Sequence, residues 1–167
     1  NSTSKTSIVA DDSDGDPDLA VSDNGDTGSV ALWLNQNGTF VEARRFERAI
    51  DTLVSCDVDD DPDILFAPHR GSGLFLLVNE NAQLAEGPTI TDEYFAEDLE
   101  LGDVDRDGLV DVIAASGAVV VIRGLGGGDF APAKSFGNKA SAQTIAVEEL
   151  NCDGALDIAT SNDFFEF

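Results

Sequence analysis

The chain has 167 residues, of which 42% are hydrophobic, and this content argues against a disordered polypeptide. Its 33 acidic residues outnumber 9 basic ones and give a formal net charge of −24. Nucleic acids and anionic membrane surfaces bind through basic patches, so the charge excludes both as partners. No signal peptide or membrane-spanning run is present, and we expect a mature chain or an excised piece of a longer one.

The predicted elements are short β-strands, because the apolar runs are brief and rich in β-branched residues. In chain order the first four are SIVA (7–10), DLAVS (18–22), GSVALWLN (28–35) and a segment headed by Phe40. The last of these, FVEARRFERAI (40–50), also admits a helix, but it falls where a fourth strand belongs.

The same order of strands recurs further along the chain. The later members are DTLVS, DILFA, GSGLFLLVN and a segment headed by Leu84; EDLEL, DVIAA, SGAVVVIRG and a segment headed by Phe130; and finally QTIAV and DIATS. Four short strands with turns between them are the unit of a β-propeller blade. We therefore predict an all-β chain of four-stranded antiparallel blades, about 3.5 of them. The expected repeats cover residues 5–48, 49–94, 95–140 and, in part, 141–167, in a single region spanning 1–167.

An acidic loop separates the first two strands of every repeat. We name these segments loop 1 (ADDSDGDPD, 10–18), loop 2 (SCDVDDDPD, 55–63), loop 3 (DVDRDGLVD, 103–111) and loop 4 (ELNCDGALD, 149–157). Their closing aspartates are spaced by 45, 48 and 46 residues. A self-similarity with this period is the signature of a repeat architecture.

Loop 3 carries the most complete set of candidate metal ligands. Side chains of Asp103, Asp105 and Asp107, the carbonyl of Leu109 and a closing carboxylate from Asp111 would surround an ion. Oxygen donors without histidine or thiolate favour calcium or magnesium, and calcium accepts six to eight oxygens in a flexible cage. An EF-hand loop begins similarly but has glutamate at position twelve, where this chain has Ala114.

The D-x-D-x-D-G-x-x-D loop between two strands, the blade-sized period and a downstream G-x-F segment resemble the FG-GAP or VCBS repeats. These repeats form the calcium-bearing propeller of integrin alpha-subunit heads and of related fungal lectins and bacterial surface proteins. The resemblance extends over essentially the whole chain. It implies a propeller with up to four calcium ions, and it leaves the partner open because function is not fixed by fold.

The other loops depart from the full pattern. Loop 1 has Ala10 and loop 2 has Ser55 at the first position, and Asp60 replaces the expected glycine in loop 2. The remaining candidate ligands are Asp12, Asp14, Asp16 and Asp18; Ser55, Asp57, Asp59, Asp61 and Asp63; and Glu149, Asn151, Asp153, Ala155 and Asp157, with Asp16, Asp61 and Ala155 contributing carbonyls. We expect loop 3 to bind calcium most readily, loop 4 next, and loops 1 and 2 last. The alternative for a degenerate loop is an acidic turn that holds water or sodium.

Weak calcium loops point to an extracellular or cell-surface location, because sites with dissociation constants of about 10⁻⁴ to 10⁻³ M stay empty in the cytosol. The sequons at Asn1 and Asn37 are candidate glycosylation sites and agree with this location. Cys56 and Cys152 lie two repeats apart, so we expect no disulfide between them, and either free thiols or a bond to another chain.

Two functions remain for the chain. The first is a calcium-stabilised structural or interaction module of an adhesin, a matrix protein or a surface filament, with a protein or glycan ligand. The second is a calcium-dependent lectin that binds glycans between blades, although one Trp and one Tyr supply few stacking surfaces. His69 is the only histidine and has no paired nucleophile, so we expect no enzyme. An incomplete last blade leaves an open edge, which a longer chain or self-assembly into an oligomer or filament would complete.

Overall fold

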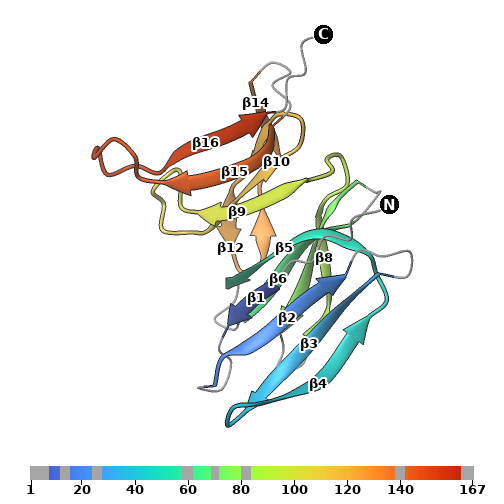
Figure 1. Ribbon diagram of the computed structural model, residues 1–167. Coiled ribbons are helices and arrows are strands. Elements are labelled where there is room, and N and C mark those ends of the chain that lie inside the picture. Colours follow the sequence, from blue (N-terminus) through green and yellow to red (C-terminus); the bar gives the residue numbers. More distant parts are fainter. Residues whose placement is uncertain are drawn as a thin grey trace. The chain divides into compact units, whose positions relative to one another are not determined.

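The computed structural model describes residues 8–11, 16–23, 28–57, 62–68, 72–79, 84–137 and 142–162. All regular structure in these residues is β-strand, and every strand pair is antiparallel (Figure 1). The predicted all-β class is thereby confirmed. The chain divides into two compact units, residues 1–95 and residues 96–167. A search of the described residues for a helix long and apolar enough to cross a membrane finds none.

Unit 1 contains two four-stranded sheets in which each strand pairs with the next along the chain. The first sheet comprises β1 (Ile8–Asp11), β2 (Asp18–Asp23), β3 (Ser29–Gln36) and β4 (Thr39–Phe46). The second comprises β5 (Ile50–Asp57), β6 (Pro62–Pro68), β7 (Leu74–Asn79) and β8 (Leu84–Thr91).

Apolar side chains from both sheets form the core of unit 1. The buried cluster consists of Ala20, Val30, Ile50, Leu53, Ile64, Phe66 and Leu77. Because side chains on a strand alternate between its faces, each sheet directs every second residue at this cluster. The two sheets of unit 1 therefore share one hydrophobic core.

Segment 40–50 is a strand and a connection, so the helix considered for it is excluded. Strand β4 ends at Phe46 and β5 begins at Ile50. A two-residue turn joins β3 to β4, with Asn37 at φ 54° and Gly38 at φ 87°. An Asn-Gly pair adopts positive φ readily and matches the twist of a β-hairpin, so the local sequence itself favours this turn.

Unit 2 holds a third four-stranded sheet and two smaller pairs. The sheet has the order β14 (Lys134–Phe136), β11 (Val119–Ile122), β10 (Asp111–Ala115) and β9 (Asp98–Gly102). The pairs are β12 (Gly124–Gly126) with β13 (Asp129–Phe130), and β15 (Ala142–Glu148) with β16 (Asp157–Asn162). Strand β10 lies in the interior of its sheet and is buried along its whole length.

The fourth strand of this sheet differs from the one expected at Phe130. Phe130 lies in the short β13, and β14 takes the place beside β11. The physical reason is the glycine run, since Gly126, Gly127 and Gly128 all adopt positive φ and turn the chain back at once. A small hairpin therefore precedes the outer strand.

Two acidic side chains mark the packing of β15 in unit 2. The Asp98 carboxylate accepts a hydrogen bond from the backbone N–H of Ile145 at 3.0 Å, which ties β9 to β15. Burial, followed by the negative charges of Asp98 and Glu148, raises the pKa of Glu100 above its ordinary value. Three carboxylates thus gather where β9 meets β15.

Candidate metal centre

Each acidic loop connects two strands of a hairpin. In loop 3, Asp111 at the start of β10 pairs with Gly102 at the end of β9, and in loop 4, Asp157 pairs with Glu148 in the same relative register. Both loops need a left-handed residue at two places, because they turn tightly within nine positions. Arg106 and Gly108 have φ 65° and 87°, and the matching residues of loop 4 follow the same pattern.

Three carboxylates of loop 3 converge. One oxygen from each of Asp103, Asp105 and Asp111 lies within 4.8 Å of the others, and no other group of three His, Cys, Asp or Glu side chains in the described residues does so. Calcium binds oxygens at about 2.3–2.6 Å, so two ligands on opposite sides of the ion stand about 5 Å apart. The spacing and the all-oxygen chemistry of this group both fit calcium.

Backbone N–H groups hold these carboxylates in place. Asp103 accepts hydrogen bonds from the N–H of Asp107 at 3.1 Å and of Gly108 at 2.9 Å. A carboxylate offers about four lone pairs, so these bonds leave acceptor capacity for an ion. Asp107, predicted as a ligand, lies outside the converging group and accepts the N–H of Leu109 at 2.9 Å.

Asp111 is the most deeply buried member, with 0% of its surface exposed. Its two oxygens accept hydrogen bonds from the N–H of Val104 at 3.0 Å and of Gly124 at 2.9 Å. A Cβ on Gly124 would overlap the carbonyl oxygen of Val110, so only glycine allows the chain to approach this closely. The closing carboxylate therefore joins loop 3 to the start of β12.

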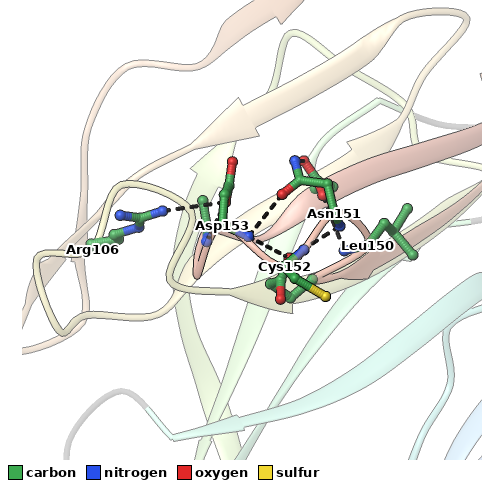
Figure 2. A network of polar contacts seen from close by, with 8 residues as sticks. Arg106, Leu150, Asn151, Cys152 and Asp153 are labelled. Carbon is green, nitrogen blue, oxygen red and sulfur yellow. Dashed lines mark hydrogen bonds and ion pairs between the residues drawn. The ribbon is translucent and has the colours of Figure 1, made fainter.

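Loop 4 repeats this hydrogen-bond pattern (Figure 2). Asp157 accepts the N–H of Leu150 at 3.0 Å, as Asp111 accepts that of Val104. Further along, Asp153 accepts the N–H of Ala155 at 2.8 Å, as Asp107 accepts that of Leu109. The predicted correspondence between loops 3 and 4 thus extends to individual backbone contacts.

The fourth loop has fewer acidic ligands than the third. Glu149 stands at the first position and accepts the N–H groups of Asn151, Cys152 and Asp153. Asn151 replaces the aspartate at the third position, and its amide donates to Asp157 at 3.4 Å. The N–H of Ala155 and then the Asn151 side chain hold the pKa of Asp153 below its ordinary value.

Loops 1 and 2 are described only in part, since Asp12, Asp14, Asp59 and Asp61 lie outside the described residues. In loop 1, Asp18 is 7% exposed and accepts the N–H of Asn35 at 2.8 Å. Asp16, expected to contribute its carbonyl, accepts the N–H of Asn37 through its side chain at 3.3 Å.

In loop 2 the predicted ligands Ser55 and Asp57 belong to strand β5, where they pair with Ile64 and Pro62. Asp63 is 1% exposed. Asp63 pairs with Cys56, seven positions earlier, whereas Asp111 and Asp157 each pair with a residue nine positions earlier. Pairing in loop 2 also continues to Asp57 and Pro62, which leaves a shorter connection between the strands.

Arg123 is a residue of this region that the sequence did not single out. Its guanidinium donates to Asp105 at 2.9 Å. The hydrogen bond to Asp105 and the negative charge of that residue raise the pKa of Arg123. The only signal for this contact is the position of Arg123 directly after the third strand, next to Gly124.

Among the remaining predictions, Asn37 lies exposed at the tip of the β3–β4 hairpin, whereas Asn1 and His69 fall outside the described residues. Neither Cys56 nor Cys152 takes part in a disulfide within the described part of the chain.

Residues 103–160 match the family described as the FG-GAP-like repeat. The match covers 58 of the 167 residues, so the similarity is shown for this segment of the chain. It begins at the first aspartate of loop 3 and extends through loop 4 into β16. The chain is therefore a β-rich protein that resembles the FG-GAP-like repeat over its third and fourth acidic loops. No curated protein matches the chain.

Proposed function

We propose that the chain is a calcium-stabilised extracellular interaction module. The observation that carries this proposal is the convergence of Asp103, Asp105 and Asp111 within a segment that matches the FG-GAP repeat. Two carboxylates about 4 Å apart repel each other by about 1 kcal/mol in water and more in a less polar environment. A divalent cation would remove this repulsion and fix the connection between β9 and β10.

Calcium would be held at loop 3 by these three carboxylates, with Leu109 contributing its carbonyl and Asp107 a further oxygen. Loop 4 is the second candidate, because its backbone contacts repeat those of loop 3. An ion at ten times its dissociation constant adds about 1.4 kcal/mol to the stability of the folded state. The chemistry that calcium would supply here is charge neutralisation.

For the architecture, we propose that each four-stranded sheet is a propeller blade and that β15 and β16 begin a fourth. In the first sheet, the closing Asp18 accepts the N–H of Asn35 in the third strand, β3. In the third sheet, the closing Asp111 accepts the N–H of Gly124, which lies just after the third strand, β11. Strand β16 pairs only with β15 among the described strands, and Asp157 has only local donors in the described contacts.

The unpaired edge of β16 can bind a further β-strand through backbone hydrogen bonds. We propose that another copy of the chain or a further segment of a longer polypeptide supplies this strand. Sedimentation of the parent chain and of the Ile158→Lys variant tests whether a second copy supplies the strand, because a charge on an edge strand disfavours strand pairing. If the parent chain associates and the variant does not, a second copy supplies the strand. If the parent and the variant are both monomers, completion by a second copy is excluded.

The calcium proposal is tested by thermal unfolding in EGTA, in calcium and in magnesium. We expect calcium to raise the midpoint more than magnesium does, and the Asp103→Asn, Asp105→Asn double variant to lose most of this response. Substitution of two exposed acids in the turn after β8, Asp92→Asn and Glu93→Gln, removes the same charge and controls for net repulsion. An equal calcium response in all three proteins would contradict the proposal. Calcium-dependent binding to a glycan array would instead support the lectin alternative.

A further inference from the structure

Two arginine side chains lie against the acidic loops. Arg123 follows β11, and its Nη1 atom lies 2.9 Å from Asp105 Oδ2 in loop 3. Arg106 belongs to loop 3 but reaches loop 4, where its Nη2 atom lies 3.6 Å from Asp153 Oδ1 (Figure 2). Loop 3 and loop 4 are thereby each contacted by one guanidinium group. The chain has only 9 basic residues against 33 acidic ones, so two arginines are a considerable share of its positive charge.

The contact at loop 3 involves a member of the converging carboxylates themselves. Asp105 is one of the three residues whose oxygens lie within 4.8 Å, so Arg123 places a permanent positive charge beside the candidate calcium position. Arginine stays protonated at any pH at which the protein is folded. Its charge reduces the mutual repulsion of the carboxylates, and the same charge repels an incoming cation.

The arginine that contacts loop 4 comes from the neighbouring loop 3, and its charge also repels an incoming cation. Arg106 occupies a left-handed position of loop 3 (φ 65°), which non-glycine residues adopt uncommonly. From this position its side chain extends to Asp153, whose Oδ1 atom already accepts the N–H of Ala155. A calcium ion bound near Asp153 would face the guanidinium of the neighbouring loop.

We propose that Arg123 and Arg106 are internal counter-ions that keep loops 3 and 4 folded without calcium and lower the calcium affinity of both loops. This inference rests on the proposed calcium function and deepens it. The two arginines set the calcium concentration at which the loops fill, and Arg106 makes the filling of loop 4 depend on a side chain of loop 3.

Calorimetric calcium titration of Arg123→Gln and Arg106→Gln tests this role. Glutamine keeps a hydrogen-bond donor and removes the charge. Removing one unit of positive charge near a divalent cation at a solvent-exposed site strengthens calcium binding by roughly threefold to tenfold. We expect a tighter site in each variant and a lower unfolding midpoint in EGTA. Arg45→Gln is the matched control, because Arg45 pairs with Glu42 on β4, away from any acidic loop in sequence, and its affinity should equal that of the parent.

The outcomes separate the two proposals. Unchanged or weaker binding in both arginine variants, with normal binding by the parent, would overturn the role of the arginines and leave the calcium function intact. Absence of saturable binding in the parent and in every variant would overturn the calcium function itself. Binding that appears only after an arginine is removed would support the counter-ion role.

Discussion

The closing aspartates of loops 3 and 4 occupy matching positions in different surroundings. Asp111 is fully buried and accepts two backbone N–H groups. Asparagine in its place keeps one acceptor oxygen and turns an NH₂ group toward the other backbone donor. One charge-assisted hydrogen bond is lost, and a buried N–H is left without an acceptor.

Each of these losses costs about 1–3 kcal/mol, so we expect Asp111→Asn to lower the free energy of unfolding by about 3 kcal/mol in EGTA. Asp157 is only partly buried and accepts one backbone N–H, from Leu150 at 3.0 Å. Water replaces a lost contact at such a position, so we expect Asp157→Asn to cost about 1 kcal/mol. The two variants make the same chemical change, which makes each a control for the other.

Urea unfolding followed by far-UV circular dichroism measures both values. Trp33 and Tyr94, the only tryptophan and tyrosine, belong to unit 1, so fluorescence does not report directly on unit 2 and serves as a reference signal. Equal losses for the two variants, or a loss below about 1 kcal/mol for Asp111→Asn, would refute the assignment of Asp111 as a buried, doubly bonded anchor.

Three further changes test other parts of the structure. Because burial raises the pKa of Glu100 in the folded state, its ionisation opposes folding as the pH rises past the ordinary range of a glutamate, so Glu100→Gln should stabilise the protein at pH 7 but not at pH 3 in thermal unfolding. Gly124→Ala should cost about 2 kcal/mol or more in urea unfolding, since the added methyl group meets a backbone carbonyl, and an unchanged midpoint would contradict that contact. Arg48 lies 5.6 Å and 5.2 Å from the ring centroids of Phe66 and Phe75, so Arg48→Ala should cost about 1 kcal/mol in unit 1, detected by fluorescence, and a neutral effect would exclude these cation–π contacts.

The sequence predicted the strands and loops well where the signal is local. The acidic nonapeptides, Gly108 and the apolar runs around them give loop 3 its position between two strands without reference to distant residues. The correspondence between loops 3 and 4 also followed from spacing alone, and the matched hydrogen bonds of Asp111 and Asp157 agree with it.

Features that depend on partners distant in sequence were harder to predict. The burial of Asp111 depends on Gly124, thirteen residues further along, and Arg123 contacts Asp105 across eighteen residues. Asp107 fits the ligand pattern by spacing, and the spacing alone did not show that its carboxylate also accepts the N–H of Leu109. Aspartate side chains are short enough to accept hydrogen bonds from nearby backbone N–H groups, and the sequence spacing does not show which N–H group each carboxylate accepts.

The most direct test of the calcium assignment is a crystal structure of the chain grown with calcium, with anomalous diffraction measured at long wavelength. We predict an anomalous peak between the carboxylates of Asp103, Asp105 and Asp111, at distances of about 2.3–2.6 Å from their oxygens. No peak at this position, with these side chains ordered and calcium at millimolar concentration, would contradict the account.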